Sequence, residues 1–217
     1  MNKPGWLPSE LLNVFSKLRH LPTMGGLSLA LISPAWGHEF GVGKDAYADF
    51  LSGNEAVLTD VPVLLGIIAA GLLAGIWKPE GFPTLWLSFV IGIIAGAALG
   101  FSGLVPPTWP AFLAVIAIGA LGAWALPFST AVMRALFFAI GVLMTNAVLS
   151  GHTVSEVPAF AYVGILFALN IGVSACARLV FLSHQYFPYG WVGIVWRAGS
   201  SWLVAIAVMA LALMLRQ

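Results

Sequence analysis

Charged side chains are scarce in this chain. Of its 217 residues, 8% are Asp, Glu, Lys or Arg and 60% are hydrophobic, whereas a soluble domain usually carries about 25% charged residues. So few charges cannot cover a water-facing surface, and the lipid bilayer must therefore be much of the solvent around the folded chain. The formal net charge of +1 gives no basic field, which excludes nucleic acid as an expected partner.

Cysteine is almost absent as well. The single cysteine, Cys176, lies inside an apolar run, and this excludes an intrachain disulfide and a cysteine-based metal cluster. No nucleophile, base and orienting residue occur at a spacing typical of a catalytic site, and the sequence has no phosphate-binding loop. The sequence therefore predicts neither enzyme activity nor a tightly bound cofactor.

Long apolar runs make up most of the chain instead. A membrane-spanning helix needs roughly 20 mostly apolar residues. Six such runs follow residue 55, at about 58–77, 84–104, 108–126, 130–149, 158–181 and 193–215. Proline and glycine occupy the gaps, as expected where one helix ends and the next begins. Because lipid leaves unpaired backbone groups unsatisfied, the sequence predicts an all-α, polytopic membrane protein with one six-helix transmembrane domain over residues 38–217.

The first 37 residues differ from the rest. A basic segment, KLRH, precedes a modest apolar stretch, LPTMGGLSLALI, which is followed by SPAWG. This order, with Ala35 and Gly37 as the small residues of a cleavage site, is typical of a secretory signal. Residues 1–37 are therefore predicted to be a signal sequence. An uncleaved signal anchor stays open because the basic region is long and Trp36 is bulky.

Charges of the two signs are distributed unevenly between the predicted loops. With the N-terminus in the cytoplasm, seven of the nine basic residues fall on or near the cytoplasmic side: Lys3, Lys17, Arg19, Lys78, Arg134, Arg178 and Arg197. This bias supports a multi-pass topology in a bacterial inner (cytoplasmic) membrane. Six of the eight acids then fall on the outer side: Glu39, Asp45, Asp49, Glu55, Asp60 and Glu156. An acidic outer surface would raise the local concentration of cations.

Two short elements of the sequence are similar to each other. Residues 59–62 read Thr-Asp-Val-Pro and residues 155–158 read Ser-Glu-Val-Pro, and each pattern opens a long apolar run. Similar helix starts with one orientation would suit the parallel repeats of some transporters. A hydroxyl group, an acid and a proline are also ordinary at a helix start. Two interpretations stay open: Asp60 and Glu156 only cap helices, or they also bind an ion.

The span from about residue 38 to 215, which includes these elements, resembles the HupE/UreJ family, small membrane proteins found with nickel hydrogenases and ureases. The similar segments are SGNEAVLTDVPVLLGIIAAGLLAGIW, SGHTVSEVPAFAYVGILFALNIG and the closing WRAGSSWLVAIAVMALAL. The resemblance implies a six-helix, permease-like fold whose histidines and acids have been tied to nickel uptake. Asp60 and Glu156 match the acids of the family motifs, whereas Val61 and Thr153 stand where histidines are usual.

Four residues are predicted to bind a metal ion: Asp60, Glu156, His152 and His38. Nickel(II) favours imidazole nitrogen, with carboxylate and water completing its shell. His38 would also supply a terminal amine if cleavage exposes it. For both histidines, an ordinary loop position is the alternative. Asn146, in the apolar run that leads to His152, is predicted to line a transport path, with helix packing as the alternative.

The sequence therefore favours a membrane protein that binds and translocates a divalent metal cation, with nickel as its substrate. One alternative is an accessory or structural subunit of a membrane complex that kept the fold and lost transport. A second is an assembly factor that presents an ion from His38 to an extracytoplasmic partner, such as a metalloenzyme under maturation.

Small residues also predict helix contacts. Gly92, Gly96 and Gly100 recur at every fourth position of one apolar run, and Gly71 and Gly75 do so in the preceding run. Such spacing is typical of closely packed membrane helices. We therefore expect these two helices to contact each other along their glycine faces.

Overall fold

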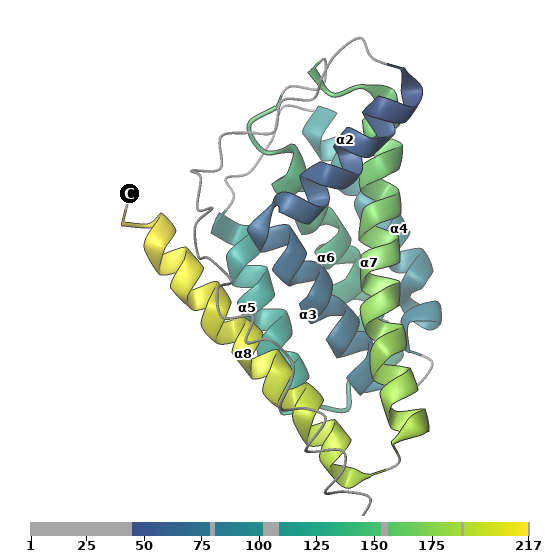
Figure 1. Cartoon of the computed structure of the whole chain (residues 1–217), viewed down its shortest axis with the longest axis vertical. Coiled ribbons are helices and arrows are strands. Elements are labelled where there is room, and N and C mark those ends of the chain that lie inside the picture. Colours follow the sequence, from purple (N-terminus) through teal and green to yellow (C-terminus); the bar gives the residue numbers. More distant parts are fainter. Residues whose placement is uncertain (1–44, 79–80, 102–108, 153–155, 188, 217) are drawn as a thin grey trace, which may run out of the picture. The chain divides into compact units, whose positions relative to one another are not determined.

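The computed structural model describes residues 45–78, 81–101, 109–152, 156–187 and 189–216. Within these ranges the regular structure is helical and no strand occurs. Seven helices follow one another (Figure 1): α2 (Ala46–Thr59), α3 (Val61–Trp77), α4 (Gly81–Phe101), α5 (Trp109–Trp124), α6 (Thr130–Leu149), α7 (Ala159–Tyr186) and α8 (Gly190–Met214). The predicted signal, residues 1–37, lies outside the described residues.

Four of the described helices are long and apolar enough to cross a membrane, namely α4, α6, α7 and α8. Helices α2 and α3 meet the same criterion only as a pair, and they are bent by 78° at their junction. Helix α5 is apolar but has 16 residues, fewer than the roughly 20 that a span needs. The predicted all-helical membrane fold is therefore confirmed with four candidate spans, or five with the bent pair, and not as six full spans.

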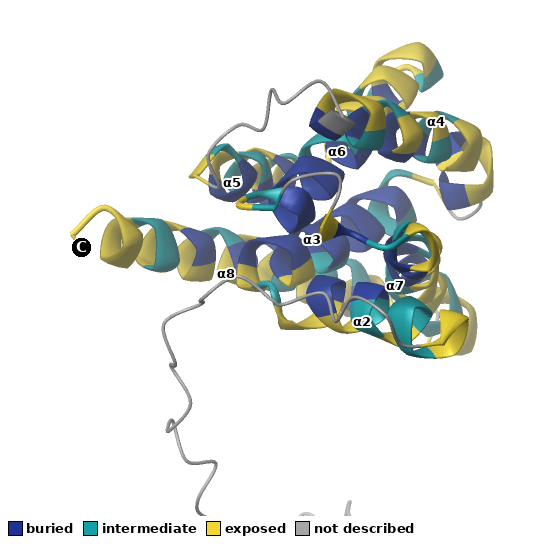
Figure 2. Cartoon of the chain, turned by 90° about the horizontal axis from the view of Figure 1, so that it is seen from above, coloured by how far each residue is buried: buried dark blue, intermediate teal, exposed yellow. Residues whose placement is uncertain are grey.

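Helix α3 lies in the middle of the arrangement, between α5, α6, α7 and α8 (Figure 2). Eleven of its 17 residues are buried, including the consecutive run Leu65–Gly66–Ile67 and the run Ala69–Ala74. A helix that is apolar on every side can pack against other helices or against lipid. The glycines of α3 allow close contact with its neighbours, because a side-chain carbon on Gly66 would collide with Met144 of α6 and one on Gly71 with Cys176 of α7.

The glycine faces contact other helices than the sequence predicted. A side-chain carbon on Gly92 or Gly96 would collide with the backbone of α6. One on Gly71 or Gly75 would collide with α7. The expected contact between the two glycine faces is therefore wrong, although α3 and α4 follow each other in the chain. Small residues allow a close approach of helices, but the pattern does not say which helix comes close.

The contacts between α3 and α7 show that these helices run in the same direction. Ile67 lies against Gly172, and Gly71 lies against Cys176. Residues that lie side by side on α3 and α7 thus differ by 105 in number. The two similar elements of the sequence therefore open parallel helices, but their own offset of 96 residues does not match the spatial register.

Candidate cation-binding region at a helix break

Asp60 occupies the break between α2 and α3. Its backbone N–H donates to the carbonyl of Ala56 at 3.2 Å, which ends α2, and its Oδ1 accepts from the N–H of Val63 at 3.0 Å, which starts α3. Pro62 has no N–H to continue the hydrogen-bond ladder of α2, and it suits the first turn of α3, where an N–H would have no partner within the helix. Asp60 therefore caps α3, as both interpretations of the sequence require, and its side chain is half-buried.

Glu156 has a different position relative to its helix. Helix α7 begins at Ala159 after Pro158, which provides no side-chain cap, and no acid lies in the first turn of α7. The Glu156 side chain is exposed. The two similar sequence elements thus give a capping carboxylate at α3 and an exposed carboxylate before the start of α7.

The two carboxylates lie at the same end of neighbouring helices but at different depths. Ile67 contacts Gly172. At 1.5 Å rise per residue, Asp60 lies about 10.5 Å from this contact and Ala159 about 19.5 Å from it, both towards this end. Asp60 is therefore about 9 Å deeper than the first residue of α7, and Glu156 precedes that residue. In Figure 1 the junction of α2 and α3 accordingly lies partway along α7. This arrangement does not favour a single ion held by both carboxylates.

His152 follows the end of α6, and its backbone N–H donates to the carbonyl of Leu149 at 3.2 Å. Helix α6 meets α3 where Met144 packs on Gly66. Leu149 is about 8 Å beyond that contact and Asp60 about 9 Å beyond it, towards the same end. The half-buried His152 therefore follows the end of α6, a helix that contacts α3, at about the depth of Asp60.

Asn146 is buried near the same end, with 2% of its surface exposed. Its Nδ2 donates to the carbonyl of Val142 at 2.8 Å, and its buried Oδ1 has no hydrogen-bond partner within the described part of the chain. At 100° per residue, Asn146 points about 200° around α6 from Met144, which faces α3. The structure thus buries Asn146 but directs it to another side of α6 than the side that contacts α3.

Sequence reasoning gave little weight to two further polar groups. Asp49, on the unforeseen helix α2, is half-buried, and its Oδ1 is enclosed without a hydrogen-bond partner among the described residues. Asn170 on α7 donates its Nδ2 to the carbonyl of Leu166 at 2.8 Å, and its Oδ1 is enclosed in the same way. Asn170 could have been noticed in the sequence as a polar residue within the apolar run 158–181. Asp49 lies before the first of the six apolar runs, so the search for spans did not reach it.

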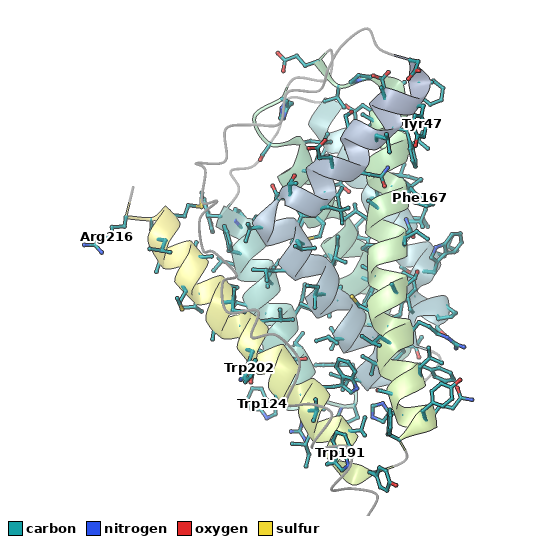
Figure 3. All side chains as sticks on the ribbon, viewed as in Figure 1. Tyr47, Trp124, Phe167, Trp191, Trp202 and Arg216 are labelled. Carbon is teal, nitrogen blue, oxygen red and sulfur yellow. The ribbon has the colours of Figure 1, made fainter. Side chains whose placement is uncertain are left out.

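The charges separate along the helices. Four described basic residues lie at the end where α3 finishes and α4 begins: Lys78, Arg134, Arg178 and Arg197. Three of them hydrogen-bond neighbouring helices or turns there, through Lys78 to Thr130 (3.5 Å), Arg134 to the carbonyl of Thr84 (3.4 Å) and Arg197 to the carbonyl of Ala123 (2.8 Å). The described acids lie towards the opposite end, on α2 and just before α3 and α7. Figure 3 shows Trp124 and Trp191 near the basic end and Arg216 at the other end of α8.

No three His, Cys, Asp or Glu side chains form a metal-binding group in the part of the chain that the structure describes. His38, the fourth predicted ligand, lies outside that part. The chain matches no protein-family model, no curated protein and no solved structure.

Proposed function

We propose that this protein binds a divalent metal cation at its acidic end and passes it across the membrane along a route that includes Asp60. The observation that carries the proposal is the carboxylate at the break of the α2–α3 pair. In membrane transporters, substrate and ion sites are typically formed where a spanning helix is interrupted. An ionisable side chain at membrane depth is costly, and this cost favours a function for it.

The distribution of charge supports both the direction and the sign of the transported ion. Basic residues mark the cytoplasmic ends of membrane helices, so we place Lys78, Arg134, Arg178 and Arg197 in the cytoplasm and the acidic end outside an inner membrane. The acids Asp49 and Glu55 on α2, Asp45 just before it and the exposed Glu156 then give the outer entrance a negative potential, which concentrates cations.

The donor groups support successive contacts rather than a single cage. Glu156 would meet the ion first, and Asp60 with His152 would meet it later, about 9 Å deeper than the first residue of α7. Carboxylate and imidazole ligands suit divalent transition metals, and weak binding at several positions suits an ion that must also leave. Nickel is the favoured substrate because these residues resemble the HupE/UreJ motifs. The delivered ion would serve the maturation of a metalloenzyme.

Paired substitutions at Asp60 separate its capping role from ion binding. Asp60→Asn keeps an oxygen that can accept from Val63 but removes the charge, so we expect normal stability with loss of Ni²⁺ uptake into proteoliposomes. Asp60→Ala removes the cap as well and should lower the free energy of unfolding by about 1 kcal/mol. We expect Glu156→Gln to reduce uptake mainly at low ionic strength, because salt screens an exposed charge.

Asp45→Asn is the matched control. Asp45 is also an acidic helix cap at this end, with its Oδ1 accepting from the N–H of Ala48 at 2.9 Å, but it lies at the far end of α2 from the break. At an ionic strength that screens exposed charges, uptake should survive this change. Wild-type uptake by Asp60→Asn would reject the route. Absence of uptake by the wild-type protein, with co-purification of a large partner complex, would favour the accessory-subunit alternative.

A further inference from the structure

A pocket of about 390 Å³ opens between α3, α4 and α7 at the basic end of the helices. Phe82 and Pro83 line it from the start of α4, and Ser174, Arg178 and Phe181 line it from α7. Gly75 of α3 also lines it. Its volume falls within the range of about 300–1,000 Å³ that is usual for small-molecule sites. The pocket lies at the opposite end of the helices from Asp60, so an inference from it does not depend on the proposed cation route.

The lining combines apolar surface with one cationic group. The guanidinium carbon of Arg178 lies 4.6 Å from the centre of the Phe181 ring, a distance at which the ring attracts the cation and restricts its position. Ser174 lies one helical turn before Arg178 and supplies a hydroxyl group on the same face. A ligand with an apolar body and an anionic head matches this arrangement.

Further cations lie at the same end of the helices as the pocket. Arg134 donates its Nε to the carbonyl of Thr84, the residue after Pro83. Lys78, at the end of α3, lies with its Nζ 4.3 Å from the centre of the Trp77 ring. Basic groups at the end of α3 and on α6 and α7 therefore lie at the end of the helices where α4 starts, and their positive potential favours a negatively charged ligand.

The helices on both sides of the pocket present apolar side chains outwards. On α4, Leu87 and Ile91 are exposed, and on α7, Ile171 and Leu179 are exposed. Such surfaces are expected to contact lipid in a membrane protein. A lipid molecule can therefore reach the pocket sideways from the bilayer, whereas a soluble ligand would have to come from the aqueous phase at this end.

We propose that this pocket binds an anionic phospholipid, with its phosphate at Arg178 and part of one acyl chain against Phe82, Pro83 and Phe181. Basic pockets between spanning helices on the cytoplasmic side are suited to anionic headgroups. Charge complementarity selects an anionic lipid over a zwitterionic one, because a zwitterionic headgroup carries no net charge to balance the arginine.

Native mass spectrometry of the full-length, delipidated protein tests this assignment. The wild-type protein is mixed separately with phosphatidylglycerol and phosphatidylcholine. We expect retention of one phosphatidylglycerol molecule with a preference of about fivefold, the factor expected for one basic group near a membrane surface. Arg178→Gln should lose this preference and Arg178→Lys should keep most of it. Ser174→Leu should reduce the retention of both lipids, because the larger side chain fills the pocket.

Arg197→Gln is the matched control for charge. Arg197 lies at the same end of the helices but donates to the carbonyl of Ala123, so its loss should leave the lipid preference unchanged. Equal retention of the two lipids by the wild-type protein would overturn the proposal. So would an unchanged preference in Arg178→Gln. Inorganic phosphate that stabilises the protein against heat as well as phosphatidylglycerol does would show a site for free anions and would also overturn it.

Discussion

The contact between α4 and α6 can be tested with a single methyl group. A Cβ added to Gly141 on α6 would lie 2.5 Å from the carbonyl oxygen of Phe89 and 2.8 Å from the backbone nitrogen of Ile93. Both are backbone atoms, so α4 itself would have to move. A Cβ added to Gly100 at the same interface would lie 3.3 Å from the Cδ1 of Leu149, a side-chain end that can rotate. We therefore expect Gly141→Ala to destabilise the protein and Gly100→Ala to be tolerated.

The expected magnitude follows from the difference between these two variants. Overpacking of a close contact typically costs about 1–3 kcal/mol. Exchange of glycine for alanine in a helix gains at most about 1 kcal/mol, and this gain favours both variants, so most of it cancels in the comparison. The free energy of unfolding should therefore be about 1–3 kcal/mol lower for Gly141→Ala than for Gly100→Ala. Gly199→Ala is a second control within a helix, because its Cβ would lie 4.0 Å from the nearest side chain of α3.

Titration of the detergent-solubilised protein with sodium dodecyl sulfate, followed by tryptophan fluorescence, measures these free energies under one set of conditions. The helical content of each variant before titration is the control for folding. If Gly141→Ala is as stable as Gly100→Ala, then α4 and α6 do not pack along this face. That result would also remove the main contact that positions α4, and with it part of the support for the lipid pocket that α4 lines.

Two further expectations concern the basic end and the orientation of the chain. Trp77 donates its indole N–H to a backbone carbonyl in the turn between α5 and α6 at 2.9 Å, so Trp77→Phe should lower the free energy of unfolding by about 1 kcal/mol in the same titration. The exposed Trp86 should tolerate the same change. Equal losses of stability in the two variants would contradict this hydrogen bond. The orientation can be tested in a Cys176→Ser background with a membrane-impermeant maleimide. This reagent should label Gln185→Cys only from the cytoplasmic side and Arg216→Cys only from the opposite side. The reverse labelling pattern would contradict the proposed orientation.

The helices that depend on local signals were predictable from the sequence. The run at 130–149 became α6 (Thr130–Leu149) with unchanged bounds, because Ser129 caps its start through the N–H of Val132 at 3.4 Å. Pro158 likewise stands just before α7. Capping groups and prolines act on neighbouring residues only, and their effect can therefore be read from a short stretch of sequence.

Helix α2 was not predicted because packing, rather than apolar composition, holds it in place. Its sequence, AYADFLSGNEAVLT, includes two acids and an asparagine, which lower its hydropathy below that of a typical span. A side-chain carbon on Gly53 would collide with the carbonyl of Ala161 on α7, and the rings of Phe50 and Phe167 lie 5.5 Å apart. These contacts join residues more than 100 positions apart, so no local pattern could reveal them.

The depth of Asp60 depends on the same contacts. The segment before Asp60 forms α2, which packs on α7, whereas Glu156 stands before a helix that continues without a break for 28 residues. Similar four-residue patterns therefore place the carboxylate of Asp60 between the two helices of a bent pair and the carboxylate of Glu156 before the start of the unbroken helix α7. An ion that enters at the acidic end would reach Glu156 before Asp60. Because only the deeper carboxylate is enclosed by helices, its neutralisation should block transport under all salt conditions, while neutralisation of the outer one should slow only the capture of the ion.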